Sequence, residues 1–170
     1  MFYSVDPAQV QNIFDLIGRE WMLITAGSEN HFNTMTASWG TMGVLWRKKV
    51  AMVFVRPNRY TYQFMEQQEG YTLSFFDEAH RSILDYCGSH SGKNVDKIAE
   101  TGLTPVVTQN GNVYFDQAKL VFECKKMYVD DIKPDHFLTP DIPEIIYNGQ
   151  DYHRLYVGEV IDCLIKEPGK

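Results

Sequence analysis

Cysteine is scarce in this sequence, and the three thiols present, Cys87, Cys124 and Cys163, are widely spaced. No Cys-x-x-Cys pair occurs, which argues against a disulfide framework and against a cysteine-based zinc site. The histidines show no His-x-x-x-His spacing, so the sequence predicts no metal site. Reduced thiols are typical of the cytoplasm, which is the compartment that we expect for this protein.

Long hydrophobic runs and a positive net charge are also missing. No apolar segment is long enough to cross a bilayer, and the N-terminal residues lack the basic and apolar regions of a signal peptide. The net charge is −6, which argues against a general nucleic-acid surface because such surfaces need clustered lysine and arginine. We therefore expect neither a membrane nor a nucleic acid as a partner.

Several common catalytic and nucleotide-binding motifs are absent as well. No Gly-x-Ser-x-Gly element occurs, so nucleophilic hydrolysis has no support. The run GSHSGKN at 88–94 departs from a phosphate-binding P-loop, because only three residues separate its glycines and Asn94 follows Lys93. An ATP site is therefore not predicted, and the choice at this loop is between a solvated polar turn and a looser contact with an anion.

The 170 residues that are present suffice for one domain with a single core, and we expect one domain over 1–170. Periodic segments that end at glycine predict helices at 6–18, 61–70, 78–88 and 94–102. The first of these places Val10, Ile13, Phe14 and Ile17 on one face. Runs rich in β-branched and aromatic residues predict strands at 21–27, 34–40, 50–55, 71–76, 104–109, 112–117, 119–129 and 152–165.

This pattern predicts an α+β protein that is mainly β. We expect a mostly antiparallel sheet, closed into a barrel because closure removes exposed strand edges, with small helices around it. The segment 130–150, rich in proline and aspartate, is the sole long irregular stretch. Segments of this length inside one domain often serve as a lid or as an interface arm.

A candidate anion site lies in the run VRPNRYT at 55–61. A strand ends at Val55 and a helix begins near Thr61, and the start of a helix offers unpaired N–H groups to an anion. Arg59 and Thr61 can add a guanidinium group and a hydroxyl group. The alternative is that Arg59 pairs with a carboxylate and that Thr61 only caps the helix, and the residues alone leave both interpretations open.

Four segments then occur in an order that resembles a known family. They are NTMTASWG at 33–40, VRPNRYT at 55–61, SHSGKNVDKIAETGLTP at 89–105 and YHRLYVGEV at 152–160. Over about residues 20–162 the sequence resembles flavoredoxin-like members of the flavin reductase family, which are FMN-binding split-barrel proteins. The resemblance implies a six-stranded antiparallel Greek-key split β-barrel that forms a homodimer and binds FMN near the subunit interface.

The resemblance also implies which residues contact the cofactor. One strand would lie along the isoalloxazine ring and the ribityl chain, a second group would hold the phosphate, and a third would close over the cofactor. These groups are, in order, Met35, Thr36, Ala37, Ser38 and Trp39; Arg56, Arg59 and Thr61; and Ser89, Ser91, Gly92 and Lys93. His153 matches the late-strand histidine of the family, near the reactive side of the ring, and is the candidate catalytic residue.

The function implied is that of an NAD(P)H-dependent flavin reductase. A hydride from NADH or NADPH would reach N5 of FMN, and the electrons would pass to free flavin, a ferric complex or a redox protein. One alternative is a flavoredoxin-type electron carrier that does not oxidise NAD(P)H itself, because no dinucleotide fingerprint is present. The other is a non-catalytic barrel for haem or another planar ligand, which the absence of a Cys-x-x-Cys-His site disfavours.

Overall fold

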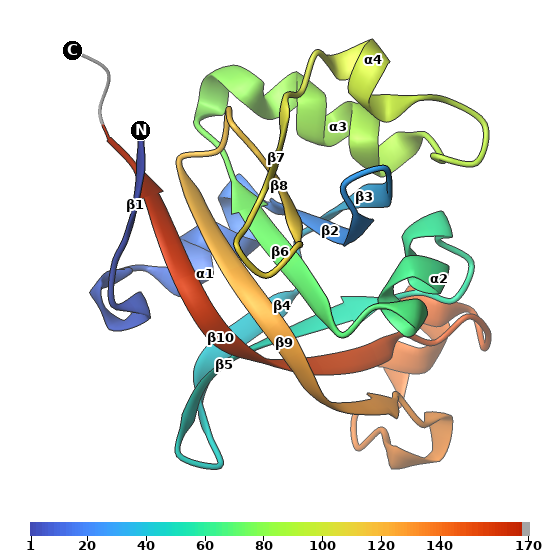
Figure 1. Ribbon diagram of the computed structural model, residues 1–170. Coiled ribbons are helices and arrows are strands. Elements are labelled where there is room, and N and C mark those ends of the chain that lie inside the picture. The colour runs from blue at the N-terminus through green and yellow to red at the C-terminus, as the bar shows by residue number, and fades with distance from the viewer. Residues whose placement is uncertain (168–170) are drawn as a thin grey trace.

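A computed structural model describes residues 1–167 and shows a curved, mainly antiparallel sheet flanked by small helices (Figure 1). Eight strands form the main sheet, and a short hairpin stands beside it. The strands are β1 (Phe2–Ser4), β2 (Met22–Ser28), β3 (His31–Ala37), β4 (Gly40–Leu45), β5 (Lys48–Val55), β6 (Gly70–Phe75), β9 (Leu120–Asp131) and β10 (Arg154–Lys166), with β7 (Pro105–Val107) and β8 (Val113–Phe115) in the hairpin.

The order of the strands shows why the sheet curls into a barrel that is split on one side. Hydrogen-bonded neighbours follow the path β3-β2-β6-β9-β10-β5-β4, and β1 pairs with β10. The two ends of this path, β3 and β4, are consecutive in the chain and are joined only by Ser38 and Trp39. The sheet must therefore bend until its two ends meet, although no ladder connects them. This gap between β3 and β4 is called the split below.

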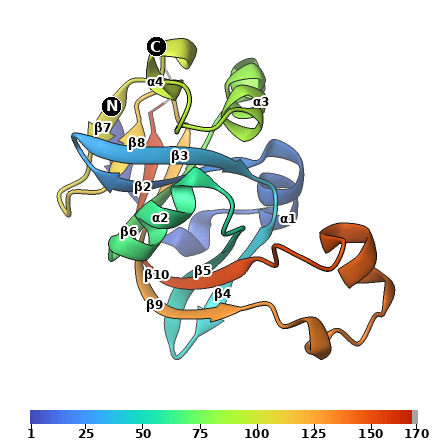
Figure 2. The same ribbon diagram turned by 90° about the vertical axis from the view of Figure 1, so that its right-hand side faces the viewer.

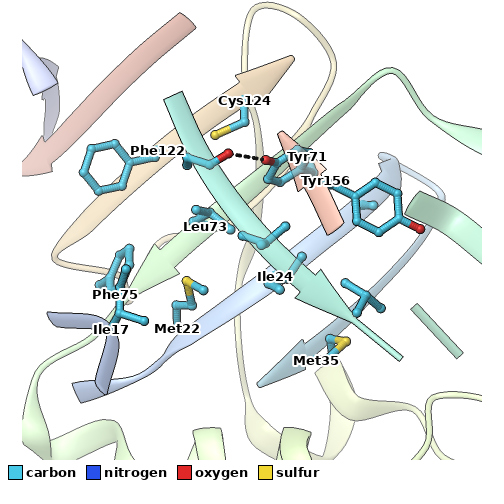
Figure 3. Packing of buried hydrophobic residues seen from close by; sticks show 14 of the residues in the cluster. Ile17, Met22, Ile24, Met35, Tyr71, Leu73, Phe75, Phe122, Cys124 and Tyr156 are labelled. Carbon is cyan, nitrogen blue, oxygen red and sulfur yellow. Dashed lines mark hydrogen bonds between the residues drawn. The ribbon is translucent and has the colours of Figure 1, made fainter. Parts of the chain in front are cut away.

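The inside of the barrel is the main hydrophobic core. One buried cluster contains side chains from six strands, which are β2, β3, β5, β6, β9 and β10 (Figure 3). This is expected for a sheet that is curled into a barrel, because one face of every strand then points to the same interior. Met22, Leu73 and Phe75 are fully buried there. Burying a side chain of this size stabilises a fold by roughly 1.5–3 kcal/mol. A second cluster, which includes Leu84 and Cys87, packs α3 against the outer face of β2.

One glycine lets the barrel wall close around a large aromatic ring. A Cβ atom at Gly158 would lie 2.4 Å from the hydroxyl oxygen of Tyr71. The strand pairing of β9 with β10 shifts register between Val157 and Gly158, which marks a bulge at the same place. The fully buried Tyr71 can therefore cross the barrel and donate a hydrogen bond to the carbonyl oxygen of Ala51, at 3.3 Å (Figure 3).

The helices lie around the barrel and do not cross its interior (Figure 2). They are η1 (Pro7–Gln9), α1 (Ile13–Asp15), η2 (Leu16–Glu20), α2 (Tyr60–Gln67), η3 (Glu78–His80), α3 (Arg81–Ser89), α4 (Lys97–Thr101), η4 (Pro134–His136) and η5 (Pro143–Tyr147). Asp96 caps α4 by accepting from the N–H groups of Ile98 and Ala99. Gly102 ends α4 with φ near 69°, a conformation that glycine adopts without strain.

The prediction of one continuous helix over 6–18 is wrong, because this segment forms separate short helical turns. Asp6 caps a single turn of 3₁₀ helix and accepts from the N–H group of Ala8, as its sequence position suggests. The chain is then extended at Val10, and Asn12 adopts a left-handed conformation with φ of 54°. This break rotates the next turn, so Phe14, expected on the buried face, is 93 % exposed.

The rest of the predicted fold agrees well with the structure. The mainly antiparallel split barrel with small helices is confirmed, and each predicted strand appears within a few residues of its expected bounds. The main sheet contains β1 and β4 in addition to the six strands expected. The segment 132–153 between β9 and β10 carries only η4 and η5 and extends beyond the barrel (Figure 2).

Candidate functional site

Three adjoining cavities lie beside the split, where β3 faces α2, the end of α3 and the start of β10. The first, of about 410 Å³, lies between β3 and the turn before α4. The second, of about 400 Å³, lies at the start of α2 and shares Asn33, Gly92 and Lys97 with the first. The third, of about 160 Å³, shares Met35, Arg56 and Arg59 with the second. Ligand sites typically have a volume of several hundred Å³.

The structure brings every predicted site residue to these cavities. We call the second cavity the anion end and the third cavity the ring end. The ring end is lined by Met35, Thr36, Ala37, Ser38, Trp39, Arg56, Arg59 and His153, and the anion end by Met35, Arg56, Arg59, Thr61, Ser89, Ser91 and Gly92. Lys93 lines the first cavity and is exposed. Cofactor contacts by these residues remain a prediction.

Two cations at the anion end, Arg59 and Lys97, are bound to backbone carbonyl oxygens. Arg59 donates a hydrogen bond from Nη1 to the carbonyl oxygen of Gly88, at 2.9 Å. Lys97 is only 6 % exposed, and its Nζ donates to the carbonyl oxygens of Thr34 and Cys87 at 2.8 and 2.7 Å. Within residues 1–167 neither Arg59 nor Lys97 forms a salt bridge.

The pKa of Lys97 reflects this environment. Burial, together with the nearby charge of Arg59, lowers the pKa of its ammonium group to about 8. The buried thiol of Cys87 acts in the opposite direction. An anion between Arg59 and Lys97 would favour the charged ammonium and so relieve this shift.

The start of α2 adds backbone donors to the same cavity. Arg59 occupies the N-cap position, and no side chain accepts from the first N–H groups of the helix. The alternative interpretation, in which Thr61 only caps this helix, is therefore wrong. Thr61 is almost fully buried, and its hydroxyl oxygen accepts from Nδ2 of Asn33 at 2.7 Å. An uncapped helix start beside two cations is a favourable place for a phosphate group.

Asn33 and Gly92 pack together at the boundary between the first cavity and the anion end. A Cβ atom at Gly92 would lie 1.9 Å from Oδ1 of Asn33, so a side chain at this position has no room. The hydrogen bond to Thr61 fixes the Asn33 amide, which cannot move aside without cost. Gly92 is thus required by close packing, which was not evident from its place in the SGK run.

The serine and threonine hydroxyls are mostly used within the protein. Ser89 donates to the carbonyl oxygen of Asp85 at 2.7 Å, and Ser91 accepts from the N–H group of Lys93 at 3.3 Å. Thr36 donates to the carbonyl oxygen of Leu84 and so ties β3 to α3. These residues shape the cavity walls, and the polar groups still available to a ligand belong mainly to the backbone and the cations.

Arg56 differs from Arg59, although both lie in the VRPNR run. Its Nη2 donates to the carbonyl oxygen of Ile146 at 2.9 Å, and its guanidinium carbon lies 5.3 Å from the centre of the Tyr147 ring. Asp151 lies 3.7 Å from Nη1. Arg56 therefore fastens the segment 132–153 to the barrel and is less available to an anion than Arg59.

His153 lies at the ring end and is 8 % exposed. Its ring centre lies 5.1 Å from that of Trp39 and 6.5 Å from that of Phe54. Burial lowers its pKa to about 4, the charge of Arg56 acts in the same direction, and Asp151 opposes both. The imidazole is therefore neutral near pH 7 and can offer one N–H donor and one acceptor nitrogen.

Sequence reasoning missed Asn33, Lys97 and Tyr147. Asn33 lies two positions before Met35, the first strand residue selected. Lys97 lies in the NVDK run of the family-like segment 89–105, and this was the available signal for it. Tyr147 belongs to the irregular segment, where no pattern predicts which side chain returns to the barrel. Among residues 1–167 no cluster of metal-ligating side chains is found, and no helix there is long and apolar enough to span a membrane.

The structure is thus a split antiparallel β-barrel with a cation-lined groove beside the split. The family described as flavin reductase like domain matches residues 14–170, and the chain belongs to this family. No curated protein sequence matches the chain.

Solved structures show the same fold. A flavoredoxin of Desulfovibrio vulgaris (Miyazaki F) superposes with a TM-score of 0.66 at 23 % identity, over 86 % of this chain and 69 % of that one. An FMN-binding domain of a flavin reductases-like enzyme from Shewanella baltica gives 0.69 at 17 % identity, over 97 % and 77 %. A flavoredoxin from Methanosarcina acetivorans gives 0.68 at 18 % identity, over 96 % and 77 %.

Proposed function

We propose that this protein binds FMN in the groove beside the split and uses it as an NAD(P)H-dependent oxidoreductase. The observation that carries the proposal is a pair of cations at the uncapped start of α2, Arg59 and Lys97, which form no salt bridge within residues 1–167. A phosphate monoester carries close to two negative charges at pH 7 and suits this place. The family membership and the FMN-binding proteins of the same fold support this choice of ligand.

The residues present fit the two ends of such a ligand. The anion end would hold the phosphate with Arg59, Lys97 and the first N–H groups of α2. The ring end would take the aromatic part, because Met35, Trp39 and Phe54 supply apolar and aromatic surface there. The two cavities are joined, since both are lined by Met35 and Arg59.

The strand β3 has a further property that suits a heteroaromatic ring. It is the last strand of the sheet path, so one of its edges is not used in the ladder. Unpaired backbone N–H and C=O groups at such an edge can bond ring nitrogen and oxygen atoms without placing a charge there. The chain's own contribution is thus to hold, orient and partly desolvate the cofactor.

When bound, FMN supplies the two-electron redox chemistry. Around it, Trp39 and Phe54 would limit access of water to the ring end, and the neutral His153 would offer a hydrogen-bond donor to a second ligand. No side chain is required as an acid or base for hydride transfer from NADH or NADPH. Electrons would then pass to free flavin, a ferric complex or a redox protein.

A second function is electron transfer without direct oxidation of NAD(P)H. It is compatible with the sequence because no dinucleotide fingerprint such as Gly-x-Gly-x-x-Gly is present. Stopped-flow mixing of the FMN-loaded protein with NADH and with NADPH separates the two functions. Rapid bleaching of the flavin absorbance with either donor supports a reductase, whereas no bleaching, with normal reduction by dithionite, supports a carrier.

The split also suggests a homodimer. A fourth cavity of about 690 Å³ lies beside the ring end and shares Ser38, Trp39 and Phe54 with it. Its wall includes Phe14, which is 93 % exposed, and Trp39, which is 45 % exposed. Exposed aromatic residues at a ligand site are typical of surfaces that another chain covers. We propose that a second copy covers this face and completes the ring end.

A further inference from the structure

His153 and Tyr147 are joined by a hydrogen bond between two buried side chains. Nδ1 of His153 lies 3.0 Å from the hydroxyl oxygen of Tyr147. The two residues come from different elements, since Tyr147 ends η5 in the segment 132–153 and His153 directly precedes β10. Among residues 1–167 neither side chain has another hydrogen-bond partner.

The direction of this hydrogen bond follows from what each group can donate. Burial raises the pKa of the Tyr147 phenol, so the phenol stays protonated, and burial keeps the imidazole of His153 neutral. An unprotonated imidazole nitrogen is a stronger hydrogen-bond acceptor than a phenol oxygen, and a phenol O–H is a stronger donor than an imidazole N–H. The phenol therefore donates to Nδ1, and the imidazole proton lies on Nε2.

The phenol itself is held in place by two neighbouring side chains. Its ring stacks on Tyr152, with ring centres 4.5 Å apart and planes 24° apart. The Arg56 guanidinium lies 5.3 Å from the ring centre and also binds the carbonyl oxygen of Ile146. These contacts fix the position of the Tyr147 hydroxyl group relative to the barrel.

We propose that Tyr147 is a positioning residue that fixes the tautomer of His153, so that Nε2–H is presented to the ring end. This inference deepens the proposed function and rests on it for its catalytic consequence. Nε2 has no partner among the described residues, and the imidazole lines the ring end together with Trp39 and Phe54. The ligand group that such a donor recognises is an uncharged oxygen acceptor, such as a carbonyl or carboxamide oxygen.

The test uses ¹⁵N-labelled protein without FMN, so that it does not depend on the proposed function. Two-bond ¹H–¹⁵N spectra at pH 7 report the tautomer of each histidine, and His153→Gln assigns the signal. We expect protonated Nε2 and an Nδ1 shift typical of a hydrogen-bonded acceptor. Tyr147→Phe should move Nδ1 downfield because the phenol proton is lost. Tyr152→Phe keeps the stacked ring and should leave both nitrogens unchanged.

The catalytic consequence is measured on the FMN-loaded protein with NADH as the probe. One lost hydrogen bond is expected to slow flavin reduction roughly threefold to tenfold in Tyr147→Phe, with the FMN Kd within twofold of the wild-type value. A wild-type signal with Nδ1 protonated, or an Nδ1 shift that Tyr147→Phe leaves in place, overturns the proposal. The wild-type spectrum alone decides the tautomer if the variant does not fold. Failure to bind FMN would contradict the proposed function but not this tautomer.

Discussion

Arg56 and Arg59 are three positions apart in the chain, but their environments differ, and this difference decides which of them can bind an anion. Arg56 is occupied by the carbonyl oxygen of Ile146 and lies near Asp151. Arg59 has only the carbonyl oxygen of Gly88 and faces the buried Lys97 across the anion end. Sequence alone could not separate them, because both lie in the VRPNR run and their partners are distant in the chain.

The first prediction concerns Arg59. Arg59→Ala should weaken FMN binding roughly tenfold to 100-fold, because charge-assisted hydrogen bonds to a phosphate contribute about 1.5–3 kcal/mol. Equilibrium quenching of FMN fluorescence measures the Kd. Arg19→Ala is the matched control, since Arg19 lies on the surface 3.7 Å from Asp15 and lines none of the three cavities of the site. Equal affinities for Arg59→Ala and the wild type would remove Arg59 from the site.

The second prediction concerns the charge of Lys97. Its pKa in the free protein is about 8, and a phosphate favours the protonated form, so FMN affinity should fall as pH rises through 8. Linkage limits the fall to roughly tenfold between pH 7 and pH 9. Below that window the phosphate itself limits binding, because its second proton is regained near pH 6.

Lys97→Met tests whether Lys97 causes this dependence. The variant keeps an unbranched apolar side chain in the buried position and removes the charge. It should bind FMN more weakly than the wild type at pH 7 and show a Kd that stays flat from pH 7 to pH 9. A wild-type slope that persists in the variant would assign the titration to another group.

At the scale of elements, the turn between α3 and α4 shapes the boundary of the anion end through Gly92. Gly92→Ala should lower the melting temperature and weaken FMN binding, since a Cβ atom would meet Oδ1 of Asn33 at 1.9 Å. Crowding of this kind typically costs about 1–3 kcal/mol. Gly43→Ala in β4 is the control, because nothing lies within 4 Å of a Cβ atom there. A Gly92→Ala variant as stable and as tight-binding as the control would contradict this packing.

Some helices and strands could be predicted from the sequence and others could not. Strands such as β5 and β6 were predicted because continuous β-branched and aromatic runs need burial on both faces. The strand β4 was missed because its GTMGVL sequence contains two glycines and is mostly exposed. The prediction of one helix over 6–18 rested on the helical spacing of its apolar residues. The left-handed backbone conformation of Asn12 interrupts the helix there, and the spacing does not reveal this.

For the whole molecule, the site residues were predicted mainly through the ordered family segments and not through any local motif. Their convergence depends on barrel closure, which brings β3, α2 and the start of β10 together around the split. Closure is a long-range property of the sheet and is not visible in any single run. Asn33, Lys97 and Tyr147 were missed for this reason, since each acts through a partner from another element.

The proposed homodimer leads to a prediction at this scale. Phe14→Asp should shift the protein from dimer to monomer in light scattering, because it places a charge on the apolar wall of the fourth cavity. Leu138→Asp changes a side chain that is equally exposed but lies in the segment 132–153, and should leave the dimer intact. A wild-type protein that is monomeric while fully loaded with FMN would contradict the shared site.

The central claim is that the groove recognises a flavin through its phosphate at Arg59, Lys97 and the start of α2. Parallel titrations of the wild-type protein with FMN and with riboflavin at pH 7 test this claim most directly. We predict that FMN binds with a micromolar or lower Kd and that riboflavin binds at least roughly 100-fold more weakly, a difference of about 2.7 kcal/mol. Equal affinities for the two flavins, or no binding of FMN, would contradict the account.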